Sequence, residues 1–156
     1  MNSYADPTPV ERNQKRVRLA IAHNNHDLLY DLEVGLQQSG FSVFSADTGI
    51  ACVAQLELYT PDLLLLDADL KWGGYDGVLA VVEANQKLCK TRVIVLASER
   101  EHPKFVAVHN LTVCDILFLP LPIATISERC IELSEANPDA NDMKSFHAKT
   151  RRELKR

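Results

Sequence analysis

The chain has 156 residues, 46% of them hydrophobic and 24% charged, which is the balance of an ordinary globular protein. At about 100–150 residues per domain, a second complete core does not fit, and this composition excludes wholesale disorder. No apolar run reaches the roughly 18–20 residues that span a bilayer, and the polar first sixteen residues do not have the pattern of a secretory signal. We therefore expect a cytoplasmic location.

Charge is distributed unevenly along the chain. Residues 144–156 contain six Lys or Arg and one acid, so this segment carries +5, while the remainder, with 11 basic and 20 acidic residues, carries −9. The total of −4 disfavours a general nucleic-acid binder. We expect a flexible lead-in over 1–16, a single domain over 17–136, and a basic tail over 137–156 that is either a solvated terminus or an arm for nucleic acid or an acidic partner.

The four cysteines do not occur in pairs with metal-binding spacing; they are Cys52, Cys89, Cys114 and Cys130. Each lies in or beside an apolar stretch, so we expect buried thiols rather than zinc ligands or a disulfide framework. This usage fits a reducing compartment.

Short apolar runs alternate with helical patterns along the chain. The runs predict five buried strands at 17–22, 41–45, 62–66, 92–97 and 114–119. After the first strand, leucines at a spacing of four predict a helix that Asn25 or Asp27 caps and Gly40 ends. Further helices are expected with Val53 and Leu56 facing inward, around 78–88, weakly at 102–111, and at 122–135.

This alternation predicts an α/β fold, a flavodoxin-like doubly wound sheet of five parallel strands in the order 2-1-3-4-5. In that order strands 1 and 3 are neighbours, and a crevice opens at their carboxyl ends. The residues expected at the crevice follow strands 1, 3 and 4: His23, Asn24, Asn25, Asp67, Asp69, Ala97, Ser98 and Glu99.

The segment PDLLLLDADLKWGGYDG, residues 61–77, resembles the receiver domain of bacterial two-component response regulators. Residues 49–56 (GIACVAQL) and 40–43 (GFSV) are similar to two further receiver motifs, in register with the first. The resemblance runs from about residue 17 to 133. It implies that Asp67 stands at the phosphoacceptor position and that Asp76 and Gly77 match the Asp-Gly pair that starts a helix.

The departures from the receiver pattern lie at the positions that carry its chemistry. The resemblance implies an acidic pair after strand 1, a hydroxyl residue ending strand 4, a lysine ending strand 5 and a switch aromatic three residues before that lysine. This chain has, in that order, His23 and Asn24, Ala97 with Ser98 one residue later, Leu119, and Ile116. The loop after Asp67 is two residues longer than usual. The family's Lys-Pro implies a cis bond, here between Leu119 and Pro120.

Phosphorylating a carboxylate brings several negative charges together, so the transition state needs cations, chiefly Mg2+ and a lysine. The oxygen ligands that remain for Mg2+ are Asp67, Asn24 and a carbonyl near Asp69. Each lost contact costs about 2–4 kcal/mol of transition-state stabilisation. We expect at most weak Mg2+ binding, no other certain cofactor, and weak or absent phosphorylation.

We interpret the chain as an atypical receiver, or pseudo-receiver, that takes part in phosphorelay-type signal transduction through protein–protein interaction and is not an enzyme. The expected partners are signalling proteins, a histidine kinase or an output protein among them. The resemblance also implies a homodimer through the helix at 102–111, the strand at 114–119 and the helix at 122–135. We expect no membrane partner, and nucleic acid only through the basic tail.

Two alternatives stay open. One is a phosphorylatable stand-alone receiver with Asp67 as phosphoacceptor, and the other is a small flavodoxin-like ligand-binding protein or enzyme that uses the crevice. His23 and His26, with Asp67 and Asp69, are a weaker candidate for a transition-metal site. The Gly-rich loop at 71–77 has no nucleotide-binding spacing, and its Trp72 either packs over the crevice mouth or is an exposed anchor for a partner.

Overall fold

The apolar runs of the sequence form a five-stranded parallel sheet in the order β2-β1-β3-β4-β5, which confirms the predicted topology. The computed structural model describes residues 16–98 and 112–135. Each strand lies within one residue of its predicted run: β1 (Arg18–Ala22), β2 (Ser42–Ala46), β3 (Leu63–Asp67), β4 (Arg92–Ala97) and β5 (Val113–Phe118). The expected helix at 102–111, most of the lead-in and the basic tail lie outside the described residues.

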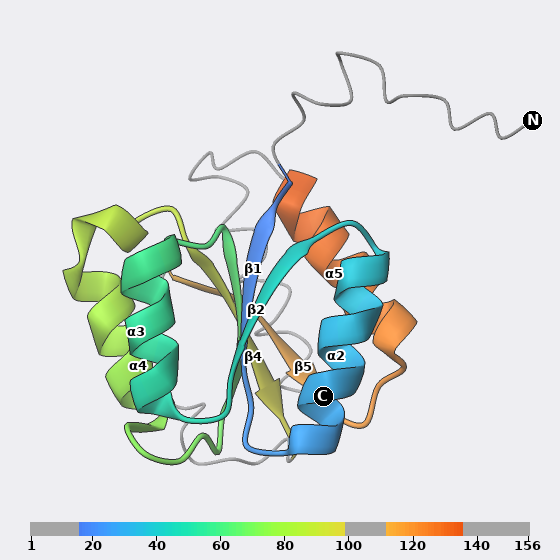
Figure 1. Ribbon diagram of the computed structural model, residues 1–156, viewed down its shortest axis with the longest axis horizontal. Coiled ribbons are helices and arrows are strands. Elements are labelled where there is room, and N and C mark those ends of the chain that lie inside the picture. The colour runs from blue at the N-terminus through green and yellow to red at the C-terminus, as the bar shows by residue number, and fades with distance from the viewer. Residues whose placement is uncertain (1–15, 99–111, 136–156) are drawn as a thin grey trace, which may run out of the picture.

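Helices cover both faces of the sheet (Figure 1). On one face lie α2 (His26–Gln38) and α5 (Ile123–Glu135), and on the other lie α3 (Gly49–Tyr59) and α4 (Gly74–Ala84), followed by the short 3-10 helix η1 (Gln86–Leu88). None of the helices in the described ranges has both the length and the apolar character needed to cross a membrane.

Alternate residues of the central strands supply two separate cores. In β3, Leu63 and Leu65 pack with α2 and α5, whereas Leu64 and Leu66 pack with α3 and α4. All four leucines are fully buried because helices cover the sheet on both sides. This arrangement holds Asp67, the next residue, at the carboxyl end of a rigid strand.

The sequence signals at the ends of α2 act as predicted. The Asn25 side chain accepts hydrogen bonds from the backbone N–H groups of Asp27 and Leu28, so Asn25 is the N-cap. Gly40 has φ +99°, and the N–H groups of Gly40 and Phe41 bond back to the last turn of α2. This is a Schellman ending, and it delivers the chain directly into β2.

The third helix begins earlier than expected. The apolar spacing predicts a helix around 78–88, but α4 spans Gly74–Ala84, and Asn85 then leaves the helix in an extended conformation. Gly73, at φ +115°, lets the chain turn from the preceding loop straight into the helix. Leu88, at the end of the expected helix, is buried but belongs to η1.

Candidate functional site

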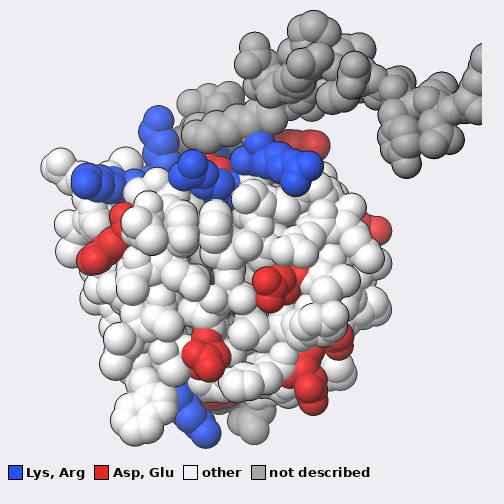
Figure 2. Space-filling model, in the orientation of Figure 1, with Lys and Arg blue, Asp and Glu red and all other residues white. Residues whose placement is uncertain are grey.

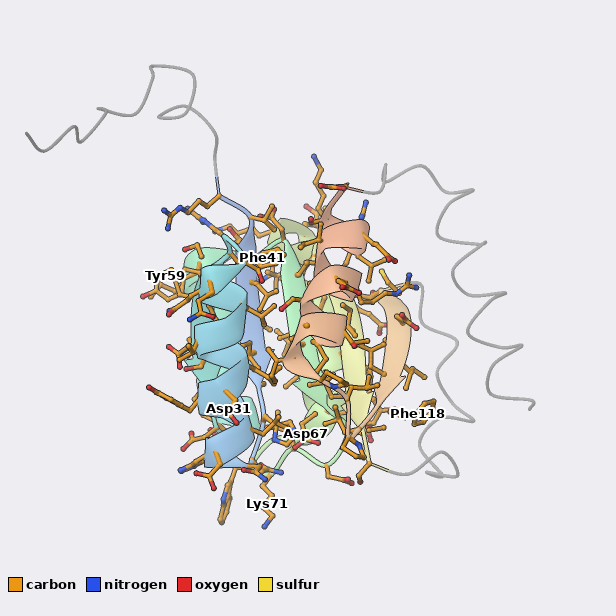
Figure 3. All side chains as sticks on the ribbon, turned by 90° about the vertical axis from the view of Figure 1, so that its right-hand side faces the viewer. Asp31, Phe41, Tyr59, Asp67, Lys71 and Phe118 are labelled. Carbon is orange, nitrogen blue, oxygen red and sulfur yellow. The ribbon has the colours of Figure 1, made fainter. Side chains whose placement is uncertain are left out.

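Asp67 lies at the carboxyl end of β3 and is 6% exposed. Its Oδ1 atom accepts a hydrogen bond from the backbone N–H of Asp69 at 2.9 Å, and its Oδ2 atom accepts one from the backbone N–H of Asn24 at 3.3 Å. Asn24 reaches Asp67 because β1 and β3 are neighbours in the sheet. Figure 3 shows Asp67 near the same end of the molecule as Lys71. The structure therefore brings the residues after strands 1 and 3 together, as predicted.

His23 lies beside Asp67 and carries no charge at neutral pH. Its Nδ1 atom is 3.7 Å from Asp67 Oδ2, and the same Nδ1 accepts a hydrogen bond from the backbone N–H of Asn25 at 3.0 Å. The tautomer that fits this bond has its proton on Nε2. Burial lowers the pKa of His23, and the nearby carboxylates of Asp67 and Asp69 only partly oppose that effect. His23 therefore does not neutralise Asp67.

Asn24 uses its side-chain amide to hold the loop that follows Asp67. Its Nδ2 donates to the backbone carbonyl of Asp69, and its Oδ1 accepts from the backbone N–H of Lys71 at 2.9 Å. Both ends of the amide are thus bonded to the loop of residues 68–73. The oxygen that the sequence suggests as a Mg2+ ligand is already engaged by the protein.

The same loop also closes on the N-terminus of α3. The carbonyls of Lys71 and Trp72 accept hydrogen bonds from the backbone N–H groups of Gly49 and Ile50, each at 2.9 Å. These N–H groups have no partner within the helix, so the loop supplies one. Trp72, Gly73 and Gly74 all have positive φ values, of 55°, 115° and 59°. The extra length of the loop is therefore folded into a defined shape.

At the other positions to which the sequence resemblance points, three of the four residues pack against the core. Ala97 and Ile116 are buried in the core on the α3 and α4 side, and Ser98 is exposed. Leu119 is partly buried against the core on the α2 and α5 side, and its bond to Pro120 is cis, as expected. Among the described residues, His23 is the one basic side chain with a nitrogen within 4 Å of the Asp67 carboxylate.

These residues do not suit a tightly held Mg2+ ion. Mg2+ favours several oxygen ligands in an octahedral arrangement, usually with one or two carboxylates. Asp67 offers one buried carboxylate, whose two oxygens already accept backbone hydrogen bonds, while the Asn24 amide is tied to the loop. Within the described ranges, no three His, Cys, Asp or Glu side chains are grouped so that they could hold a metal ion.

The proposed histidine metal pair is not formed. The Nε2 atom of His26 lies 3.3 Å from Asp47 Oδ2, and both side chains are exposed on the surface rather than directed to Asp67. Trp72 is 74% exposed, so of the two alternatives for this side chain, packing over the crevice mouth is wrong. The expectation that all four thiols are buried is also wrong, because Cys89 is exposed. It lies in the turn after η1, where the chain is at the surface.

Three features of the site were missed from the sequence. They are the Asn25 N–H that fixes the His23 tautomer, the Lys71 N–H that engages Asn24, and the contact of the loop with Gly49. The sequence did contain a signal for the contact between the loop and Gly49. Adjacent glycines at 73–74 and a glycine at the start of α3 mark places of close backbone approach. A buried ion pair between Asp115 and Arg129 was missed as well.

The fold is that of known receiver domains. No protein-family model matches the chain. Among solved structures, the chain is similar to the chemotaxis response regulator CheY4 of Vibrio cholerae, with 15% identity, a TM-score of 0.68, and coverage of 76% of this chain and 99% of that one. It is also similar to a CheY-like response regulator receiver domain protein from Methanospirillum hungatei, with 20% identity, a TM-score of 0.67, and coverage of 78% and 96%. The chain therefore has the fold of a CheY-like response regulator receiver domain.

Proposed function

We propose that the chain is an atypical receiver, a pseudo-receiver that takes part in phosphorelay-type signalling by binding other proteins, with weak or no phosphorylation of Asp67. The observation that carries the proposal is the Asn24 amide, which bonds to the loop through both its oxygen and its nitrogen. A receiver needs cations around its phosphoacceptor, and here neither His23 nor Asn24, the two residues beside Asp67, supplies a positive charge.

The electrostatics of the site support weak phosphorylation. A phosphoryl group on Asp67 would add negative charge in a buried place, where charge is costly unless it is compensated. His23 is held neutral, Asn24 is an amide, and Leu119 stands where the receiver pattern has its lysine. Relative to the receiver pattern, the residues at the acidic pair remove carboxylate ligands for Mg2+, and Leu119 removes the positive charge of a lysine.

The absence of the relay groups supports binding without switching. In the receiver pattern a hydroxyl and an aromatic ring carry the phosphoryl signal away from the site. At those positions Ala97 and Ile116 are 2% and 5% exposed within one continuous core. Tightly packed apolar side chains have no second position to move to when a carboxylate nearby changes. A partner would therefore recognise a constant surface.

Intact-mass spectrometry tests the proposal directly. The full chain is incubated with acetyl phosphate and Mg2+, and the +80 Da species is followed over time, with Asp67→Asn as the control for modification elsewhere. We expect little or no Asp67-dependent increase. Fluorescence of Trp72, the only tryptophan in the chain, is followed in parallel during titration with beryllofluoride and Mg2+, and we expect no saturable change.

The first alternative is a conventional phosphorylatable receiver, and one observation favours it. Asp67 stands at the end of β3 and both of its oxygens are oriented by backbone N–H groups, which supports Asp67 as an acceptor. Phosphorylation of Asp67 at a rate typical of receivers, with a change at β5 and α5, would replace the proposal with this alternative. A small-ligand site in the crevice has less support, since the described residues there hold no nucleophile with a neighbouring base.

A further inference from the structure

We propose that the outer face of α3 and α4 binds a second copy of this chain, with the two α3 helices antiparallel across a two-fold axis. We call this surface the α3/α4 face and define it by seven residues: Ile50, Ala54 and Leu58 on α3, Gly77, Ala80 and Ala84 on α4, and Trp72 on the loop before α4. The proposal does not depend on whether Asp67 is phosphorylated.

The large apolar side chains exposed on the described surface gather on and around α3. Of six such residues, three belong to the α3/α4 face, and they are Ile50 at 69%, Leu58 at 72% and Trp72 at 74% exposure. A helix at the surface of a single domain normally turns polar residues outward, but α3 exposes an apolar row. Figure 2 shows few charged side chains over α3, with Lys and Arg gathered at the upper edge. Exposed large apolar side chains gathered in this way are typical of an interface.

The order of residues along α3 suits a second copy in particular. Ile50, Ala54 and Leu58 are spaced by four, so they form one ridge on the helix, with large residues at the ends and a small one at the centre. A two-fold axis at Ala54 places Ile50 of one copy against Leu58 of the other, twice, and lets the backbones approach where the alanines meet. Ridges of this spacing pack into each other in the commonest class of helix crossing. The surface is self-complementary, as a two-fold interface requires.

The neighbouring parts of the face extend this contact. Three of the outward residues of α4, Gly77, Ala80 and Ala84, are small, and a Cβ added to Gly77 would meet nothing within 4 Å, so this part of α4 offers an open surface beside the α3 ridge. Trp72 continues the ridge past Ile50, because its carbonyl is bonded to the Ile50 N–H. Its φ of +55° is unfavourable for a tryptophan, yet the loop holds its side chain out in solvent. A second copy would cover that side chain.

Charges at the two ends of the face favour the antiparallel arrangement. At the C-terminal ends of α3 and α4 the charges balance, with the basic residues Arg18, Lys87 and Lys90 and the acidic residues Glu57, Asp62 and Glu83. At the N-terminal ends two acidic residues stand against one basic residue, namely Asp47 and Asp76 against Lys71. A parallel pair would place the two acidic N-terminal ends side by side, whereas an antiparallel pair places each acidic end beside a balanced one.

Sedimentation equilibrium of the full chain tests the proposal, with Trp72 emission against concentration as a second measurement. We expect a dimer with a Kd of about 1–100 µM, and a blue shift of Trp72 emission over the same concentrations. Ala54→Glu places two like charges at the two-fold axis and should weaken the dimer about a hundredfold. Tyr30→Glu on α2, which is 67% exposed and lies away from this face, is the matched control and should leave the Kd unchanged.

A charge-pair experiment tests the antiparallel direction. Ile50→Lys and Leu58→Glu should each weaken association, because each buries an unpaired charge. The double variant pairs the ammonium of one copy with the carboxylate of the other, and it should associate at least about tenfold more tightly than either single variant. A chain that stays monomeric at millimolar concentration overturns the proposal. So does a dimer that survives Ala54→Glu but is broken by Ile131→Glu on α5, and so does a double variant that does not recover.

Discussion

Gly49 and Gly73 are in direct backbone contact. A Cβ built on Gly49 would lie 3.0 Å from Cα of Gly73 and 2.8 Å from the carbonyl oxygen of Trp72. This contact joins the N-terminus of α3 to the loop that begins at Asp67, and only a residue without a side chain fits there.

We therefore expect Gly49→Ala to push the loop away from α3 and to lower the free energy of unfolding by about 1–3 kcal/mol. Gly77→Ala is the matched control, because Gly77 lies inside α4 and an added Cβ meets nothing within 4 Å. This control should raise stability by about 0.5–1 kcal/mol. Urea denaturation measures both variants, and Trp72 emission reports the loop. Equal effects of the two substitutions would show that the contact does not matter.

Replacing Asn24 with aspartate should couple stability to Mg2+. Asn24→Asp keeps an oxygen for the Lys71 N–H but loses the donor to the Asp69 carbonyl and places a second carboxylate beside Asp67. Without Mg2+ we expect a loss of about 1 kcal/mol. Millimolar Mg2+ should restore it, because two carboxylates now face one cation.

Thermal melting with and without Mg2+ measures this effect. Asn24→Ala is the control, since it also releases the loop but adds no carboxylate, and its melting temperature should not respond to Mg2+. The aspartate variant should still show no phosphorylation-dependent change at β5, because Leu119, Ala97 and Ile116 are unaltered. If Mg2+ does not change the melting temperature of the Asn24→Asp variant, the two carboxylates do not form a Mg2+ site and the prediction is wrong.

His23 should make the protein less stable in mild acid. Burial lowers its pKa in the folded state below the ordinary value of 6.5, so the unfolded chain takes up a proton at a higher pH than the folded chain does. Stability contributed by neutral His23 is therefore present above pH 6.5 and is lost as the pH falls from 6.5 towards the lowered pKa.

Chemical denaturation between pH 7.5 and pH 5 measures this loss. His23→Asn keeps an acceptor for the Asn25 N–H but does not titrate, so its stability should fall less over this range than that of the unaltered protein. The His26→Gln variant, altered at an exposed position, should lose as much stability over this pH range as the unaltered protein does. If stability falls equally with pH in all three proteins, His23 is not the group responsible for the loss.

The ion pair between Asp115 and Arg129 should contribute strongly to stability. Arg129 Nε donates to Asp115 Oδ2 at 2.5 Å, and the two side chains are only 15% and 6% exposed. Asp115→Asn should lower the free energy of unfolding by about 2–3 kcal/mol, because a buried charge-assisted hydrogen bond is lost. Glu132→Gln removes the exposed partner of the same arginine and should cost at most about 0.5 kcal/mol. A denaturation experiment that ranks the two variants in the opposite order would contradict this.

The candidate site could be located from the sequence because its location depends on topology alone. Once β1 and β3 are neighbours in a parallel sheet, the residues that follow them must share one edge, and this places His23 and Asn24 at Asp67. The start of the helix after β3 could not be predicted as well from the sequence, since it depends on three consecutive residues with positive φ. Apolar spacing does not report such backbone conformations.

The sequence alone determined the order of the strands, the two buried faces of β3 and the identity of the residues that surround Asp67. Alternating apolar patterns specify these features locally, and parallel-sheet geometry leaves few other arrangements. Only the tertiary structure decided what those residues do. Asn24 bonds to Asp69 and Lys71, which are 45 and 47 positions further along the chain. An amide or an imidazole takes its role from whichever donors and acceptors folding brings within 3 Å or so, and no local pattern encodes that partner.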